Sequence, residues 1–265
     1  MKEITHKFDS VRAFGLAVRD AKRLEGAGDS ALKGEDIYSS GLSFTQSLKI
    51  ALNGGAWEEG AKDLMAVKLP ALDIEKIIDA PLLQSSVQGF APIVANYLAG
   101  VPDSMFNFEE VPQPKKLIKI CISAGFLGDV DAAFVFNRGR AILACINALD
   151  KQGFDVEVVA VSQSLCKKIS ACFIVETIIK RSNDKLSIAS LAFALCCAAY
   201  LRRGIFRLRE ACPVFTWATK YDGYGHTQKY EPEGYDVFLP PISSKNVRNF
   251  YTPSLALQTI AKYFK

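Results

Sequence analysis

The order strand, long helix, strand between residues 117 and 161 constrains the fold of this chain most. Leu117–Ile122 is a short apolar run, and Phe154–Val161 is a second one, rich in valine. Between them, Asp131–Gln152 has apolar residues at helical spacing and is followed by Gly153, a typical helix stop. Because a helical crossover joins the two strands, we expect them to be parallel neighbours in one sheet.

The rest of the C-terminal half extends this sheet. We predict a third strand over Ile169–Ile179, and the connection before it is too short for a helical crossover. This strand should therefore pair antiparallel, at an edge of the sheet. A helix capped by Ser187, a fourth strand at Tyr235–Leu239 and a helix from Pro253 complete an α/β domain. We expect a three-layer, Rossmann-like sheet with one antiparallel edge strand.

The N-terminal part of the chain is predicted to be mainly helical. A first helix should begin after Asp9 or Ser10, either of which can cap the apolar pattern that follows, and a second helix should begin after Ser43. Shorter helices are expected near Trp57 and after Pro92. Prolines at positions 102, 112 and 114 indicate a boundary. We therefore divide the chain into a helical N-terminal region, residues 1–114, packed on an α/β domain, residues 115–265.

Composition excludes several classes of protein. With 49% apolar residues among 265, the chain can bury a core and is not a disordered polymer. No apolar run reaches the ~18 residues of a membrane helix, and residues 1–9 contain no signal-peptide core. Seven cysteines without regular spacing suit a reducing compartment. We expect a cytoplasmic protein with no membrane partner.

Catalytic and cofactor motifs are absent from the sequence. There are two histidines, and several of the seven cysteines lie in apolar segments, where a thiol stays protonated. Neither zinc-ligand spacing nor a hydrolase motif occurs. We therefore expect no catalytic residues, cofactor or metal, although an enzyme acting at the carboxyl ends of the strands remains an alternative.

Basic residues concentrate in the middle of the chain and are the strongest indication of function. Residues 1–114 contain 11 Lys and Arg against 16 Asp and Glu, whereas residues 115–229 contain 17 against 9. Lysine and arginine interleaved with aromatic residues are typical of proteins that hold single-stranded nucleic acid. The candidate binding residues are Lys115, Lys116, Lys167, Lys168, Lys180, Arg181, Arg202, Arg203, Arg207, Tyr221, Tyr224 and Lys229. Alternatively, these side chains form a solvated face or pair with the acidic N-terminal region.

Several stretches of the chain resemble a family of uncharacterised tailed-bacteriophage proteins, known only as a domain of unknown function. They are Trp57 with Gly60, Tyr97-Leu-Ala-Gly-Val-Pro-Asp-Ser-Met105, Asn137-Arg-Gly-Arg-Ala-Ile-Leu143, Ala148-Leu-Asp-Lys-Gln-Gly-Phe-Asp-Val-Glu157 and Leu201-Arg-Arg-Gly-Ile-Phe206. The order of elements also resembles a von Willebrand factor A-like domain. That resemblance implies a metal loop after the first strand, but Ser123 stands where the first aspartate of the loop belongs. Asp129 or Asp131 should instead cap the following helix.

The sequence therefore leads to one favoured function and two alternatives. We expect a non-enzymatic phage protein that binds single-stranded DNA or RNA in the cytoplasm of the infected host cell and assists phage transcription or replication. A first alternative is a protein-interaction module that docks on a phage polymerase, an ATPase or a host factor. The second alternative is the enzyme mentioned above.

Overall fold

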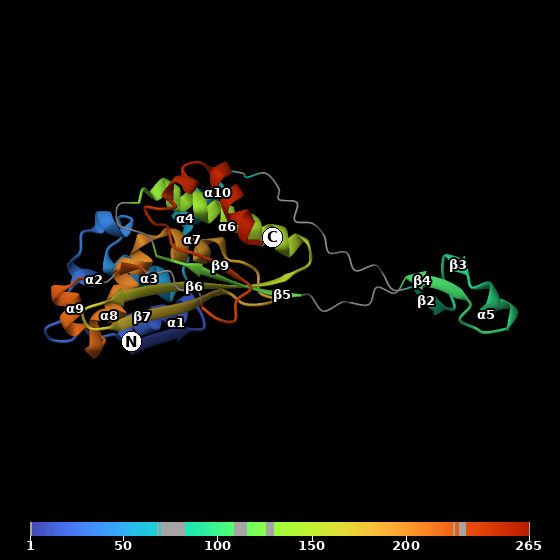
Figure 1. The fold of residues 1–265 in the computed structure, drawn as a ribbon, viewed down its shortest axis with the longest axis horizontal. Helices are drawn as coiled ribbons and strands as arrows, with labels where there is room; N and C mark the ends of the chain where they lie inside the picture. Colours follow the sequence, from blue (N-terminus) through green and yellow to red (C-terminus); the bar gives the residue numbers. More distant parts are fainter. Residues whose placement is uncertain are drawn as a thin grey trace. The chain divides into compact units, whose positions relative to one another are not determined.

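The computed structural model describes residues 2–67, 69, 83–108, 116–125, 130–224, 226–227 and 232–264. It divides into two compact units, one of residues 1–73 and 117–265 and the other of residues 74–116 (Figure 1). This division differs from the expected boundary at residues 114 and 115. The first 73 residues belong to the same unit as the α/β core, because they contribute a strand and several helices to it.

The larger unit, which we call the core unit, is built on a mixed sheet. The strand order is β1 (Lys2–Phe8), β7 (Ala171–Lys180), β6 (Asp155–Cys166), β5 (Leu117–Ser123) and β9 (Val237–Leu239), and β8 (His226–Thr227) also pairs with β6. Strands β5 and β6 are parallel and are joined by helix α6 (Ala132–Lys151), as the sequence predicts. Strand β7 is antiparallel to β6, again as predicted. The chain is therefore an α/β protein.

The position of β7 corrects one expectation. We predicted β7 as an edge strand, but β1 pairs with it in parallel from Lys2 opposite Ala171 to Phe8 opposite Thr177. Strand β1 alternates in exposure, with every second residue, from Ile4 to Phe8, partly buried. That period of two is typical of a strand with one covered face, and it lies in a region predicted to be helical.

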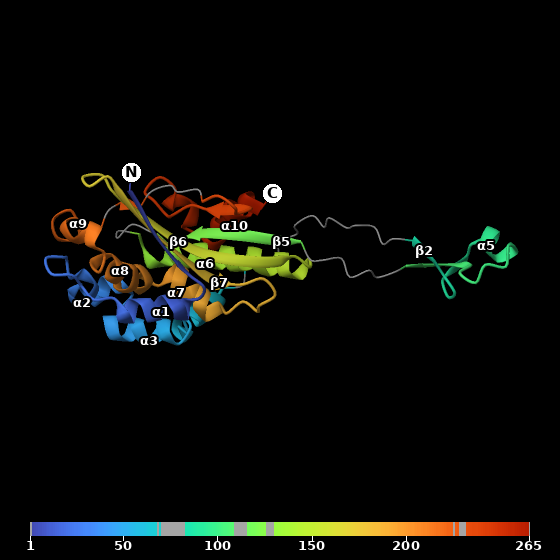
Figure 2. The ribbon, with the colours of Figure 1, turned by 90° about the horizontal axis from the view of Figure 1, so that it is seen from below.

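Helices of the core unit begin where their caps predict. They include α1 (Val11–Asp20), α3 (Phe44–Leu52), α4 (Glu58–Met65), α7 (Ile188–Cys196) and α10 (Pro253–Ala261). Ser10, Ser43 and Ser187 each accept a hydrogen bond from a backbone N–H in the first turn, and Ser43 forms a full capping box with Gln46. Figure 2 shows α1 and α3 on the same side of the strands.

Shorter helices and turns connect these elements, and α2, α8 and α9 among them lie at one end of the core unit (Figures 1 and 2). They are α2 (Ser30–Lys33), 3-10 turns at Asp36–Ser39, Pro213–Phe215, Val247–Phe250 and Lys262–Phe264, a π-helix at Tyr200–Ile205, α8 (Phe206–Glu210) and α9 (Thr216–Tyr221). Residues 200–210 form a π-helical turn followed by α8. π-Helical turns are rare and occur often at functional sites.

Aromatic side chains fill the space between the helices and the sheet. Phe14 of α1 lies 4.6 Å from the ring of Tyr200, and Phe193 of α7 meets Tyr200 edge-on at 5.8 Å. The buried Tyr200 hydroxyl lies 2.7 Å from the Thr177 hydroxyl of β7. Gly204 faces the ring of Phe14 so closely that a Cβ there would lie 2.4 Å from it. The core therefore requires glycine at this point of the π-helix.

The smaller unit, residues 74–116, has a sheet of its own. Strands β2 (Leu83–Ser86), β4 (Met105–Phe108) and β3 (Ala91–Pro92) are antiparallel in the order β2-β4-β3. Helix α5 (Val94–Leu98) follows β3 and confirms the short helix predicted after Pro92. Two of the three predicted boundary prolines, at positions 112 and 114, lie outside the described residues.

Among the described residues, no single helix is long and apolar enough to cross a membrane, and the one pair that passes by composition, Ile188–Cys196 with Tyr200–Glu210, is bent by 67°.

Candidate nucleic-acid interface

Two of the predicted binding residues are buried, which corrects the expectation that they belong to an accessible basic face. The Lys180 ammonium donates a hydrogen bond of 2.7 Å to the Val156 carbonyl and lies 3.9 Å from the Asp150 carboxylate. The Arg203 guanidinium donates to the carbonyls of Ser30, Ala31, Gly34 and Leu42 and to the Asp36 carboxylate. Both cations are therefore occupied inside the protein.

Other predicted residues are partly occupied. Arg207 donates from Nε to the Ala21 carbonyl at 3.1 Å, and the exposed Arg181 donates to the Asp9 carbonyl at 3.1 Å. Lys116 is exposed but belongs to the smaller unit. Lys115 and Lys229 lie outside the described residues.

Lys168, a predicted binding residue, and Lys220 lie beside exposed aromatic rings at α9 and the turn between β6 and β7. We call this surface the basic–aromatic patch, formed by Lys167, Lys168, Trp217, Lys220 and Tyr221. Trp217 is 46% exposed and Tyr221 62% exposed, and their ring centroids are 5.9 Å apart. The Lys168 ammonium lies 5.7 Å from the Trp217 ring, and the Lys220 ammonium lies 5.0 Å from the Tyr221 ring.

Helix α9 produces this patch by its two-sided pattern. Ala218 and Thr219 are buried against the unit, so Trp217, Lys220 and Tyr221 remain on the outer side. The Lys168 ammonium is also 2.7 Å from the Asp222 carboxylate, and the hydrogen bond to this carboxylate raises the pKa of Lys168. Lys168 is thus held as a cation beside the tryptophan.

A cavity of about 540 Å³ lies at the same end of the core unit, where α2 and α8 meet. Arg202, Tyr38, Phe206 and Tyr224 contribute to its lining, together with Lys33. The π-helical turn separates two neighbouring arginines, because Arg203 enters the core while Arg202 stays at the cavity with its guanidinium 5.5 Å from the Tyr38 ring. A cavity of this volume suits a ligand the size of a nucleotide.

Tyr224 is fixed in the cavity wall by hydrogen bonds and stacking. Its hydroxyl accepts from the Ser30 N–H at 3.1 Å and donates to the Glu210 carboxylate. The ring stacks on Phe206 with centroids 3.9 Å apart. Tyr224, which the sequence suggested as a free stacking ring, is therefore already stacked within the protein.

Glu210 gives the stability of this region a dependence on pH. Its side chain is buried and also accepts from the Ala31 N–H at 2.9 Å, and burial raises its pKa above the usual 4.5. Glu210 of the unfolded chain loses its proton near pH 4.5, whereas the folded protein keeps it to higher pH. The free energy of unfolding should therefore fall as pH rises from 4.5 through the raised pKa, and Glu210→Gln should lack this decrease.

Urea unfolding between pH 4.5 and 7.5 measures this difference. Glu210→Gln keeps an acceptor oxygen for both donors, so the variant should gain stability relative to the wild type as pH rises. Glu25→Gln, at an exposed carboxylate, is the matched control and should follow the wild type. Parallel curves for the wild type and Glu210→Gln would contradict this assignment.

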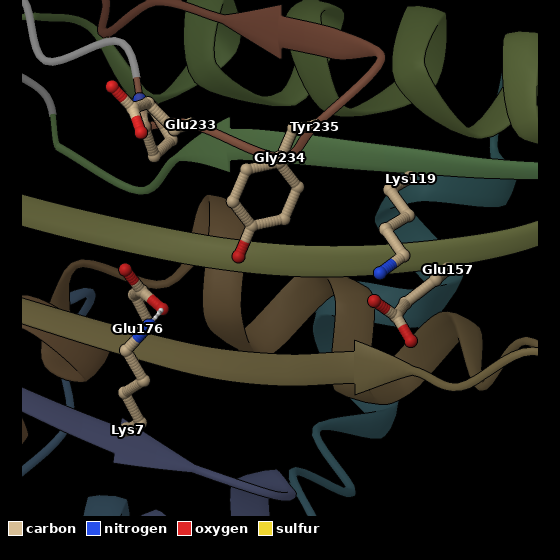
Figure 3. A pocket seen from close by; sticks show the side chains of 8 residues that line it. Lys7, Lys119, Glu157, Glu176, Glu233, Gly234 and Tyr235 are labelled. Atoms are coloured by element: carbon tan, nitrogen blue, oxygen red, sulfur yellow. Dashed lines mark ion pairs between the residues drawn. The ribbon is translucent and has the colours of Figure 1, made fainter.

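A second cavity, of about 590 Å³, lies on the polar face of the sheet (Figure 3). Lys7 of β1 pairs with Glu176 of β7 at 3.0 Å, and Lys119 and Glu157 extend from β5 and β6. With Glu233, the lining has three carboxylates and two ammonium groups, a balance unsuited to a polyanion. This part of the sheet face opens to the cavity, so the third layer expected from the sequence does not cover it.

The structure also shows the residues that stand where the von Willebrand factor A-like resemblance implies a metal loop. The Asp131 carboxylate accepts a hydrogen bond of 2.8 Å from the Ala133 N–H and caps α6, as predicted. The Ser123 hydroxyl accepts from the Gly125 N–H at 3.4 Å. Asp129, the other candidate for the cap, lies outside the described residues.

Burial keeps several thiols protonated. It raises the pKa of Cys121, Cys145 and Cys196 to about 12 and that of Cys197 to about 11. These four cysteines are therefore small apolar core residues, as expected from their sequence context.

Sequence reasoning missed Trp217 and Tyr38. Trp217 and Tyr221 are four residues apart, with Lys220 beside them, so on a helix the two rings share one face. That spacing was a usable signal for α9. No sequence pattern indicated Tyr38, because only the tertiary structure places its ring beside Arg202.

A family model described as "Domain of unknown function (DUF7192)" matches residues 2–263. No curated protein and no solved structure matches the chain.

Proposed function

Since the chain belongs to the DUF7192 family, a domain of unknown function, its role has to be argued from its surface, and we propose that it binds single-stranded DNA or RNA through the basic–aromatic patch. The observation that carries this proposal is the exposed pair Trp217 and Tyr221, each with a lysine ammonium over or beside its ring. Bases stack on exposed rings while lysines contact the phosphates between them.

The neighbouring cavity supports the same proposal. Arg202 and Lys33 supply positive charge there, and Tyr38 and Phe206 supply aromatic wall. A strand that stacks on the patch can place an unstacked base or a phosphate in this cavity. Binding of this kind needs no reaction at the site, so the proposed role is non-enzymatic.

The biological setting is the wider part of the proposal. The resemblance of the Asn137–Leu143 and Leu201–Phe206 stretches to tailed-phage proteins supports a role in phage transcription or replication, alongside a phage or host polymerase. The parallel β5-α6-β6 unit with the antiparallel β7 supports a von Willebrand factor A-like fold. The phage setting and the von Willebrand factor A-like fold are proposed in addition to nucleic-acid binding by the basic–aromatic patch.

Fluorescence anisotropy with labelled single-stranded DNA and RNA tests the binding site. Trp217→Ala should weaken binding about 10-fold, because one stacked base contributes about 1–3 kcal/mol. Binding should also weaken steeply as salt concentration rises. The control is Trp57→Phe, since Trp57 is the other tryptophan and is buried.

The control variant also gives a direct spectroscopic readout. Trp57→Phe leaves Trp217 as the only tryptophan, so stacked bases should quench its fluorescence during the titration. No binding at low salt, or equal binding by Trp217→Ala and the wild type, would overturn the proposal.

A further inference from the structure

The sheet of the core unit ends on two unlike edges. Strand β9, at one edge, has three residues and is followed by Pro240 and Pro241, which cannot continue a ladder. Strand β1, at the other edge, has seven residues without proline, and its register with β7 runs from Lys2 to Phe8 without a bulge. Proteins normally shorten or interrupt a sheet edge, because its unpaired backbone groups attract another strand. Such an interruption is present at β9 and absent from the described residues of β1.

Alternate backbone groups of β1 face away from the sheet. The Lys2 N–H donates to the Ser170 carbonyl at 2.9 Å, so the even-numbered residues direct their backbone groups toward β7. Glu3, Thr5 and Lys7 therefore direct their N–H and carbonyl groups outward. Among the described strands, β1 pairs with β7 alone, so these outward groups form the open edge of the sheet.

The side chains of the same three residues complement their own reversed order. All three are exposed and lie on one face of the sheet. When a second copy of β1 runs antiparallel with Thr5 opposite Thr5, Glu3 of each copy lies opposite Lys7 of the other. Opposite charges and threonine pairs stabilise neighbouring strands. Lys7 can serve two carboxylates, because its ammonium has three donors and its side chain is 72% exposed beside Glu176 (Figure 3).

We propose that β1 is a homodimer interface, in which the β1 strands of two copies pair antiparallel and join two core sheets into one. A two-fold axis at Thr5 gives every outward N–H and carbonyl of the three residues a partner. Moving this axis by one residue in either direction leaves one of the three opposite a residue outside β1. The lysines that discourage pairing with unlike strands are matched in this register by Glu3. The dimer uses only residues of the core unit and does not depend on nucleic-acid binding at the basic–aromatic patch.

Light scattering after size-exclusion chromatography, over a range of concentrations of the full chain, tests the dimer. The wild type should approach twice its chain mass of 29.0 kDa as concentration rises. Thr5→Pro should stay at 29.0 kDa, because it removes an outward N–H at the centre of the pairing and none of those that bind β7. The circular dichroism of this variant should match that of the wild type.

Charge reversal tests the match between the two strands. Glu3→Lys places like charges opposite each other twice in the dimer, so its dissociation constant should rise about 10-fold. Glu25→Lys is the matched control, since it reverses an exposed carboxylate outside β1 and should dimerise like the wild type. Equal dissociation constants for the two variants would overturn the proposed register.

Disulfide trapping tests the register directly. In the proposed dimer the two Thr5 residues are neighbours, so oxidised Thr5→Cys should form a covalent dimer on a non-reducing gel. The two Glu3 residues would be about 14 Å apart, so Glu3→Cys should not be trapped. The wild type is the control for the seven cysteines of the chain, six of which are buried. A wild type that is monomeric at all concentrations, a Thr5→Pro variant that still dimerises, or equal trapping of the two cysteine variants would each overturn the proposal.

Discussion

Replacing Arg203 by methionine should lower the free energy of unfolding by about 3–5 kcal/mol, the effect of leaving buried polar groups without their charged partner. Arg203 is buried in the π-helical turn and is the shared donor for four backbone carbonyls and the Asp36 carboxylate. Methionine fills a similar volume but donates nothing, so the segment from Ser30 to Leu42 loses its anchor. Urea unfolding followed by circular dichroism measures the loss.

Arg202 provides the matched control on the same turn. Its guanidinium lies 5.5 Å from the Tyr38 ring at the cavity, and a cation–π contact of this kind contributes about 0.5–1 kcal/mol, so Arg202→Met should cost less than about 1 kcal/mol. Arg203→Lys should recover only part of the loss, because a single ammonium cannot reach acceptors spread around a planar guanidinium. If Arg203→Met unfolds like the wild type but binds nucleic acid weakly, Arg203 contacts the ligand and its structural role is refuted.

The sequence was informative about the fold where one local pattern decides the outcome. The helix starts at Ser10 and Ser43 and the crossover between β5 and β6 can be predicted from residues that are close together in the sequence. Strand β1 was missed because only Ile4 and Phe8 among its seven residues are strongly apolar, so its alternation is a weak signal. Its partner, β7, lies more than 160 residues away along the chain, and no local pattern identifies such a partner.

The candidate site was less predictable, for a physical reason. A lysine or arginine in a sequence is a cation, but whether water, a carbonyl or a phosphate solvates it depends on the tertiary structure. The buried Lys180 and Arg203 donate hydrogen bonds to backbone carbonyls, whereas Lys168 and Lys220 lie at the surface beside aromatic rings. Counting basic residues therefore could not separate the buried cations from those that lie at the surface.

In the motif Asn137-Arg-Gly-Arg, polar and charged side chains likewise bind groups inside the protein. Asn137 donates to the Phe250 carbonyl at 2.9 Å, and a Cβ at Gly139 would lie 2.5 Å from the Cys196 sulfur. Arg140 donates to the Asp63 carbonyl at 2.8 Å. These contacts join α6 to three other parts of the core unit, so the motif helps to hold the fold together.

Arg138, at the centre of this motif, should be as sensitive as Arg203. Its buried guanidinium donates to the carbonyls of Ser123, Leu239 and Pro240, at 2.9, 3.3 and 2.8 Å. It thereby ties the carboxyl ends of β5 and β9 to α6. Arg138→Met should lower the free energy of unfolding by about 3–5 kcal/mol, because three carbonyls lose their donor in a site closed to water.

Arg140→Met, two residues later on the same helix, is the control. Arg140 is only partly buried, and water can replace its hydrogen bonds to the Asp63 carbonyl and the Asn137 amide oxygen, so this variant should lose about 1 kcal/mol in the same urea titration. Hydrogen exchange should localise the effect of Arg138→Met to β5 and β9, since their ends are no longer held. Equal losses for the two variants would show that charge on α6, and not the buried carbonyl contacts, sets its contribution to stability.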